Sequence, residues 1–183
     1  MDLTLRHYRP ADRDPVWRVH DRALRGSNLD YDPEYNRYLR HVRRSFVDAG
    51  GQFLVGTLPA SALDGDHSAL DDDDGRYVVA IGGYQPLDSL PPEDHPPAFG
   101  GASDRAARLR SVAVLPACQG RGVGSRLVDR VESDAREAGF GTLVLSSVAS
   151  MSGARAFWRG RGYERLGEEP ASGTDSVWFR TDC

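Results

Sequence analysis

The chain has 183 residues, of which 39% are hydrophobic, and it carries a formal net charge of −4. This size and composition suffice for one domain over residues 1–183 with its own core. A net negative charge without a basic tract argues against nucleic-acid binding. No apolar run approaches the length of a membrane span and the first residues lack the apolar core of a signal peptide, so we expect no membrane association and a cytoplasmic location. Two cysteines are too few for a disulfide framework.

The first third of the chain predicts two strands and two helices. Apolar and polar residues alternate over residues 3–8, which is typical of a strand, and a helix is expected over 10–24. The segment 33–49 begins with a proline and is followed by a glycine pair, so we expect a second helix there. Residues 53–58 are apolar and predict the next strand.

Two loops are expected to separate the central strands. Residues 59–75 are small, polar and acidic, and we interpret them as a mobile, solvated surface connection. Its four consecutive aspartates, 71–74, lack the spaced ligands and turn glycine of a calcium loop, so we expect no metal site. A strongly apolar strand is predicted at 77–84, and a proline-rich, mobile excursion follows over 85–106.

The last part of the chain alternates strands and helices. After a strand at 109–114, an amphipathic helix repeats apolar residues at helical spacing and ends at Gly139. The remaining predicted elements are a buried strand at 142–148, a short helix at 154–159, and a closing strand pair at 163–168 and 176–180.

The most informative segment joins the 109–114 strand to the amphipathic helix. Three alternate glycines stand at its turn: Gly120, Gly122 and Gly124. Because glycine accepts positive φ and lets a ligand approach the backbone, free amides there can point at an anion. The following helix start adds unpaired donors and partial positive charge. The segment therefore predicts a site for a diphosphate-containing cofactor.

Two common nucleotide-binding patterns fit this turn poorly. The phosphate-binding loop of kinases and GTPases requires a lysine after the glycines, and the chain contains no lysine. A dinucleotide fingerprint belongs to an early βαβ unit, whereas this turn lies two-thirds along the chain. A nucleotide-binding protein of another fold remains a third interpretation, which predicts binding of ATP or NAD.

Two motifs resemble one known family. The pattern Q-x-x-G-x-G at 119–124, after a Val-x-Val strand, looks like the acyl-CoA-binding motif of the GNAT N-acetyltransferase superfamily. The pattern A-x-x-F-W-x-x-x-G-Y at 154–163 is similar to a second signature of that family, in the expected order. The resemblance covers about 107–166. It implies an α/β (α+β) fold with a mixed central sheet of six or seven strands flanked by about four helices.

The resemblance also implies how acetyl-CoA, or another acyl-CoA, is held. The strands at 109–114 and 142–148 splay apart, and the backbone amides of Val112 and Val114 contact the pantetheine arm and polarise the thioester carbonyl. For the arginines, the alternative is a solvated surface charge. The residues that we expect to bind the cofactor are Val112, Ala113, Val114, Gln119, Gly120, Arg121, Gly122, Val123, Gly124, Ser125, Arg126, Ser150, Arg155 and Trp158.

Three positions depart from the family pattern where catalysis is concerned. Trp158 stands where a tyrosine commonly serves as general acid, and it cannot act as a practical proton source. Arg108 stands in place of a glutamate used by some members, and Met151 in place of an asparagine. As replacement bases we expect Glu93 and His95, which cluster with Asp94 in the 85–106 excursion, although a loop histidine between prolines is more often exposed than catalytic. The alternatives are Asp32 and Glu34 near the second helix, with water as a proton relay.

The resemblance implies transfer of an acetyl group from acetyl-CoA to a primary amine by direct attack in a ternary complex. We expect the acceptor to be a small molecule or a peptide, and its amine must lose a proton before attack. Net acidity gives only a weak preference for a cationic amine. Tyr84 and Tyr31 are candidates to shape the acceptor pocket, and the alternative for both is a core or surface aromatic. The alternative function is a catalytically degenerate acyl-CoA sensor or interaction module. We also expect a homodimer, formed through the closing strands or the excursion.

Overall fold

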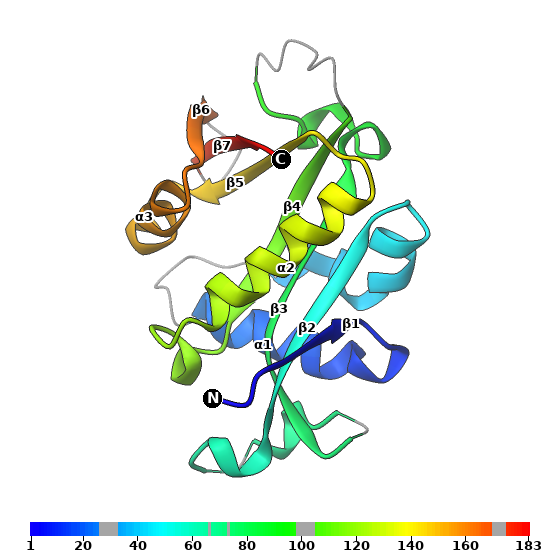
Figure 1. Ribbon diagram of the computed structural model, residues 1–183, viewed down its shortest axis with the longest axis vertical. Helices are drawn as coiled ribbons and strands as arrows, with labels where there is room; N and C mark the ends of the chain where they lie inside the picture. Colours follow the sequence, from blue (N-terminus) through cyan, green and yellow to red (C-terminus); the bar gives the residue numbers. More distant parts are fainter. Residues whose placement is uncertain (26–32, 66, 73, 98–104, 170–174) are drawn as a thin grey trace.

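The computed structural model describes the chain except for residues 26–32, 66, 73, 98–104 and 170–174 (Figure 1). Its described part forms one mixed sheet of seven strands in the order β1-β2-β3-β4-β5-β7-β6. Neighbouring strands are antiparallel except β4 and β5, which are parallel. The strands are β1 Thr4–His7, β2 Gln52–Pro59, β3 Arg76–Pro86, β4 Ala106–Val114, β5 Thr142–Val148, β6 Glu164–Glu169 and β7 Ser176–Asp182.

Helices cover both faces of this sheet. α2, Val123–Glu137, packs against β2, β3 and β4 in the front of the view of Figure 1. α1, Arg13–Arg25, packs against β3 and β4 from behind. α3, Ser152–Gly160, lies beside α2, because Arg161 at its end pairs with Asp129 and Glu132 of α2 at 2.7 and 2.8 Å. The predicted mixed sheet with flanking helices is confirmed.

The second predicted helix differs from expectation. Residues 33–49 are helical but not a regular α-helix: a 3-10 helix spans Pro33–His41 and a π-helical turn spans Arg43–Val47. The backbone kinks at Asn36, where φ is −109° and ψ is 23°. Asparagine competes with helical backbone bonds through its side chain, and its oxygen here accepts a hydrogen bond from the Tyr38 hydroxyl at 3.0 Å. We call residues 33–47 the kinked segment.

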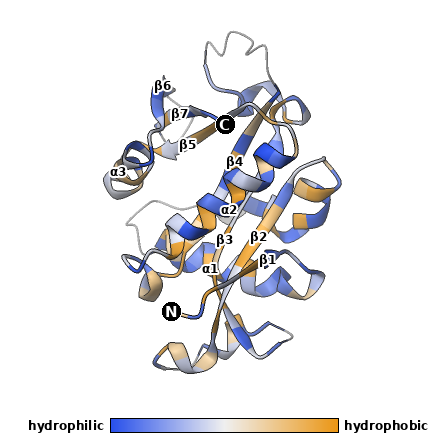
Figure 2. Ribbon diagram, viewed as in Figure 1, coloured by the Kyte–Doolittle hydropathy of each residue, from blue (hydrophilic) through white to orange (hydrophobic). Residues whose placement is uncertain are grey.

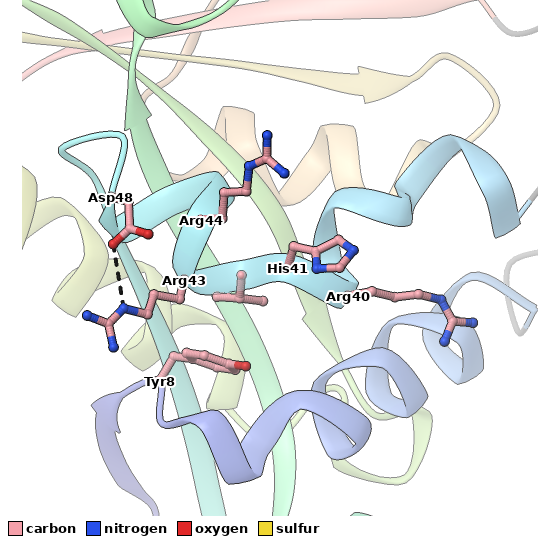
Figure 3. Close-up of a pocket in the computed structure, with 7 residues that line it drawn as sticks. Tyr8, Arg40, His41, Arg43, Arg44 and Asp48 are labelled. Carbon is pink, nitrogen blue, oxygen red and sulfur yellow. Dashed lines mark ion pairs between the residues drawn. The ribbon is translucent and has the colours of Figure 1, made fainter.

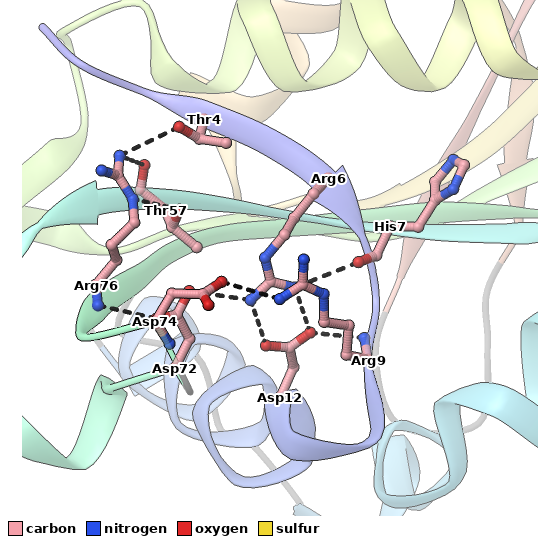
Figure 4. Close-up of polar contacts among 9 residues, drawn as sticks. All are labelled: Thr4, Arg6, His7, Arg9, Asp12, Thr57, Asp72, Asp74 and Arg76. Atoms are coloured by element: carbon pink, nitrogen blue, oxygen red, sulfur yellow. Dashed lines mark hydrogen bonds and ion pairs between the residues drawn. The ribbon is translucent and has the colours of Figure 1, made fainter.

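The interpretation of the acidic connection as fully solvated is wrong at Asp72. Its side chain is fully buried and accepts a hydrogen bond from Arg6 at 3.0 Å, while Arg6 also donates to Asp12 at 2.7 Å (Figure 4). The Asp72 carboxylate further accepts the backbone N–H groups of Asp74 and Arg76. This contact joins the connection between β2 and β3 to β1 and to the 3-10 turn Pro10–Asp12 that precedes α1. We call Arg6, Asp12 and Asp72 the Arg6 cluster.

Buried apolar side chains form the core between the sheet and its helices. Figure 2 shows the hydrophobic residues concentrated along β2 and β3. The helix periodicity predicted for α2 at Leu127, Val131, Ala135 and Ala138 is confirmed for the first three, which are buried. Ala138 is exposed, because the helix ends at Glu137 and Ala138 is its C-cap residue.

Tyr84 belongs to this core. It is 2% exposed, its ring packs edge-on against Phe140, and its hydroxyl donates to the Asp134 carbonyl, so the structure favours the core role over a place in the acceptor pocket. Tyr31 and Asp32 lie outside the described residues.

Candidate functional site

The central feature is the divergence of β4 from β5. The two strands pair only over Ala106–Arg108 with Thr142–Val144, although β4 continues to Val114 and β5 to Val148. Figure 1 shows the two ribbons separating beyond this point. One side of β4 is therefore left without a partner strand after Arg108. We call this divergence the splay; it is the arrangement that the family resemblance implied.

A β-bulge in β4 determines which amides face the splay. Ser111 has φ of +58°, and the pairing with β3 shifts there, between the pairs Gly83–Arg110 and Ile81–Ala113. Beyond the bulge, the Leu115 N–H donates to the Val79 carbonyl of β3 at 2.8 Å. Since successive residues of a strand direct their backbone groups to opposite sides, the N–H groups of Val112 and Val114 point away from β3, into the splay. The backbone of Ala113 faces β3.

The glycine turn presents a run of free amides at the start of α2. Gly120 and Gly122 have φ of +69° and +77°, and Gly122 is the N-cap residue. The first helical bond runs from the Arg126 N–H to the Gly122 carbonyl at 3.1 Å. Residues 119–122 form a turn, and within the described part of the chain none of the six amides of residues 120–125 makes a hydrogen bond of ordinary geometry. Six unsatisfied donors at a helix N-terminus form an anion site.

Gly124 is required by packing rather than by its φ. A Cβ there would stand 3.4 Å from the Val114 Cγ2 and 4.0 Å from the Phe157 ring. Val123 is buried in the core, so only its backbone is available to a ligand. The turn is thus wedged between β4 and α3, at the open end of the splay.

The polar side chains that we expected at the cofactor lie in different places. The Gln119 amide donates to the Val114 carbonyl at 3.0 Å and so ties the turn to β4. Arg121 and Ser150 are exposed, whereas Arg126 donates to the Leu3 carbonyl at 3.1 Å, toward the far edge of the sheet. Arg155 has a buried Nε without a hydrogen-bond partner.

Trp158 is a core residue. Its side chain packs edge-on against Phe157 and Tyr163, and the residue is 7% exposed. The Tyr163 hydroxyl donates to Glu132 of α2 at 2.9 Å; burial, then this carboxylate, raises the pKa of Tyr163 above its ordinary range. These contacts indicate that the Trp158 side chain serves mainly to pack α3 against the core.

The two expected bases, Glu93 and His95, do not form a pair in the splay. Glu93 is exposed, and His95 Nε2 lies 3.1 Å from the Leu90 carbonyl. Asp94 between them is instead bound by Arg108 at 2.6 Å and lies 3.4 Å from Arg110. A search of the described residues finds no group of histidine, cysteine and acidic side chains that could hold a metal ion.

A buried polar cluster at the narrow end of the splay escaped the sequence analysis. Arg108 donates to Asp94 and, across the splay, to the Ser146 hydroxyl of β5 at 3.0 Å, and its guanidinium stacks 4.6 Å from the Trp178 ring. Arg110 stacks 4.2 Å from the ring of Tyr38. Burial, then the charge of Arg110, lowers the pKa of Arg108, against the opposite effect of Asp94.

The second half of this cluster comes from the kinked segment. The Tyr38 hydroxyl lies 3.0 Å from the Ser111 hydroxyl at the bulge. Arg110 also donates to Gln85 at 3.2 Å. No local sequence motif predicts these contacts, because they join four segments that are far apart in the chain: the kinked segment, β3, β4 and the 85–106 excursion.

A surface hollow of about 250 Å³ lies elsewhere, on the outer side of the kinked segment. Figure 3 shows Tyr8 facing Arg40, His41 and Arg43 there. Neither the glycine turn nor β4 or β5 contributes to its lining, so it is separate from the splay.

The sequence matches the model of the acetyltransferase (GNAT) family over residues 27–163. The chain belongs to this family. None of the curated proteins compared with it matches significantly. No helix of the described chain is both long and apolar enough to cross a bilayer.

Solved GNAT structures share the fold. An acetyltransferase of the GNAT family from Staphylococcus aureus Mu50 superposes with a TM-score of 0.73 at 14% identity, covering 98% of both chains. The acetyltransferase yncA of Salmonella typhimurium, solved with its cofactor acetyl-CoA, gives 0.64 at 16% identity over 100% of this chain and 94% of its own. The ribosomal-protein-alanine N-acetyltransferase of Brucella melitensis gives 0.63 at 19%, over 98% and 99%.

As a GNAT member, the chain departs from the common catalytic pattern in the positions that the sequence indicated. Arg108 replaces a glutamate that some members use, and it also fills space: its side chain is 9% exposed and closes the narrow end of the splay. Met151 precedes α3 as its N-cap residue without a side-chain capping bond. The glycine turn therefore follows the family pattern more closely than positions 108, 151 and 158 do.

Proposed function

We propose that this chain transfers an acetyl group from acetyl-CoA to a primary amine of a small molecule or peptide, by direct attack within a ternary complex. One observation carries the proposal: six unpartnered amides of the glycine turn stand beside a β4 edge whose own amides face the splay. This arrangement offers donors for a diphosphate and, next to them, a strand edge for an extended arm.

The residues present fit acetyl-CoA. The amides of 120–125 suit its diphosphate, Arg121 is exposed beside them, and the edge of β4 suits its pantetheine arm. Bound acetyl-CoA supplies the thioester carbonyl that the amine attacks. The N–H groups of Val112 and Val114 face the splay and donate to the negative charge that develops on a carbonyl oxygen there, which lowers the barrier.

Two proton transfers complete the reaction: the amine must lose a proton, because an alkylamine is mostly protonated at neutral pH, and the CoA thiolate that leaves when the C–S bond breaks takes up a proton from water. The Asp94 carboxylate is engaged in ion pairs with the guanidinium groups of Arg108 and Arg110, so we do not assign it the role of base. Glu93 and His95 stay as proposed bases that act through water, since neither contacts the amides of the splay. A Glu93→Ala/His95→Ala double variant with full activity would exclude this pair.

The test is amine-dependent release of free thiol from acetyl-CoA, measured against polyamines, amino acids, aminoglycosides and short peptides. The proposal predicts release that requires one class of amine, together with a rise in melting temperature when acetyl-CoA alone is added. Stabilisation by acetyl-CoA without release for any amine would favour the sensor function. Stabilisation by ATP or NAD instead of acetyl-CoA would contradict the proposal and favour another nucleotide-binding function.

A further inference from the structure

The narrow end of the splay holds more positive than negative charge. Arg108 and Arg110 both point to the face covered by the kinked segment, where Asp94 is the one carboxylate that the described residues bring within ion-pair distance of them. Two guanidinium groups and one carboxylate leave one positive charge uncompensated. The side chains of Arg108 and Arg110 are only 9% and 14% exposed, so solvent screens this charge weakly.

Arg108 and Arg110 lie close enough to the splay-facing amides of β4 for one small molecule to contact both. Arg110 precedes Val112 by two residues, so their Cα atoms are at most about 7 Å apart along the strand. Arg108 reaches across to Ser146, two residues beyond the last paired residue of β5. A molecule whose amine lies beside the Val112 amide therefore places its neighbouring groups against this cluster.

The donors match a carboxylate. A guanidinium group binds carboxylates through parallel N–H bonds, and the hydroxyl groups of Tyr38 and Ser111, 3.0 Å apart, stand at the edge of the cluster. Arg110 is held in place by stacking on Tyr38 and by its bond to Gln85. The cluster is thus built before a ligand arrives.

We propose that Arg108 and Arg110 form a carboxylate-binding subsite, and that the acceptor is a small amine that also carries a carboxylate, such as a free amino acid. This inference rests on the proposed acetyl transfer, and it names the class of its acceptor. It reverses the weak preference for a cationic acceptor that the net charge of −4 suggested, because the local charge of the cluster has the opposite sign.

Binding of the product class tests the subsite without turnover. In the presence of CoA, calorimetry compares N-acetyl derivatives of glycine, serine, leucine and phenylalanine with the corresponding N-acetyl amino acid amides. These pairs differ in the carboxylate alone. At least one acid is expected to bind ten times more tightly than its amide. The subsite is refuted when no acid binds more tightly than its amide.

Variants then assign the preference to the cluster. Arg110→Gln is expected to reduce the ratio of acid to amide affinity to below two, whereas Arg159→Gln, at an exposed position of α3, leaves it unchanged. Asp94→Asn removes the internal counter-charge and is expected to raise the ratio at least threefold. A purely structural role would lower affinity for acid and amide alike in both cluster variants, and that result would overturn the proposal.

The two proposals fail in different ways. If acids are preferred but no amine releases thiol from acetyl-CoA, the subsite stands and the transferase function fails. If amines release thiol but a free amino acid reacts no faster than its amide, the transferase stands and the subsite fails. The amine of the amide is less basic, so a larger fraction of it is unprotonated at neutral pH, and a preference for the acid would run against this advantage.

Discussion

The glycine turn and the ionic clusters are built in different ways. The turn, residues 120–125, is one continuous segment that presents backbone amides. The Arg6 cluster and the cluster around Arg108 instead join side chains from segments far apart in the chain, such as Arg6 with Asp72 and Arg108 with Asp94. The comparison teaches that a backbone site can be identified from local sequence, whereas a site of paired side chains requires the fold.

The largest expected effect is a loss of stability in the Arg6 cluster that leaves acetyl-CoA binding unchanged. Asp72→Asn leaves the guanidinium of Arg6 with one carboxylate fewer in a buried site, so we expect the free energy of unfolding to fall by about 3–5 kcal/mol, measured by chemical denaturation. Acetyl-CoA affinity should not change. Asp74→Asn is the matched control, since its ion pair with Arg9 is more than half exposed and should contribute less than about 1 kcal/mol. Equal losses in the two variants would contradict the account.

The same carboxylate gives a pH dependence with a defined sign. Burial acts to raise the pKa of Asp72, but hydrogen bonds from the Arg76 amide and from Arg6 outweigh it and lower the pKa below its ordinary value. The stabilisation is therefore fully present above the ordinary aspartate pKa of about 4 and is lost as the pH falls below it. The stability difference between wild type and Asp72→Asn should shrink in acid.

Gly122→Asp tests whether the glycine turn binds the cofactor, and its expected effect on binding is similar in size to the stability effect of Asp72→Asn. A carboxylate in the ring of free amides should weaken acetyl-CoA binding by about 100-fold, or ~3 kcal/mol, measured by calorimetry. Gly75→Asp is the control: both glycines have positive φ, +77° and +71°, and open space around the added Cβ, so both variants carry the same backbone strain and charge. A similar loss of affinity in both would remove the turn from the cofactor site.

His20, which belongs neither to the glycine turn nor to the ionic clusters, is expected to give stability a second pH dependence. His20 of α1 is 5% exposed, and burial lowers its pKa to about 4, against a weaker effect of Asp21. Below the ordinary histidine pKa of about 6.5 the unfolded chain takes up a proton that the folded chain resists, so stability falls from pH 6.5 toward pH 4 by about 2–3 kcal/mol. In His20→Gln this slope should disappear; a slope that persists would assign it to another group.

The smallest effect is expected at Gln119. Its amide ties the turn to the Val114 carbonyl at 3.0 Å, on the exposed side of the site. Gln119→Leu should raise the KM for acetyl-CoA about fivefold, or ~1 kcal/mol, with kcat unchanged. Gln52→Leu, on β2, is the control. A fall in kcat alone would mean that Gln119 acts on the reaction instead of on binding.

The sequence predicted the parts of the fold that depend on local pattern. Strand β5 was predicted at its observed bounds, and α2 with its buried face, because periodicity and glycine punctuation decide both. The kinked segment was not predicted as such, since the kink at Asn36 depends on a side-chain contact with Tyr38. Asp72 was wrongly expected to be solvated for a related reason. The sequence does not distinguish it from its neighbouring aspartates, and only the fold shows that Arg6 binds it.

In the candidate site, too, the backbone features could be predicted from local sequence and the side-chain contacts could not. The turn could be predicted residue by residue, because free amides follow from glycines before a helix. Arg108 could be recognised as a departure but not interpreted, because its partners Asp94 and Ser146 come from the excursion and from β5. The direction of Arg126 toward Leu3 was equally inaccessible, since a helix position does not reveal which neighbour a long side chain reaches.

The most direct measurement is a titration of ¹⁵N-labelled protein with acetyl-CoA, followed by amide chemical shifts in NMR. The account predicts that the largest shifts occur at Gly120, Gly122 and Gly124 and at the splay-facing amides of Val112 and Val114. Shifts confined to the hollow lined by Tyr8 and residues 40–44, with the glycine amides unchanged, would contradict it.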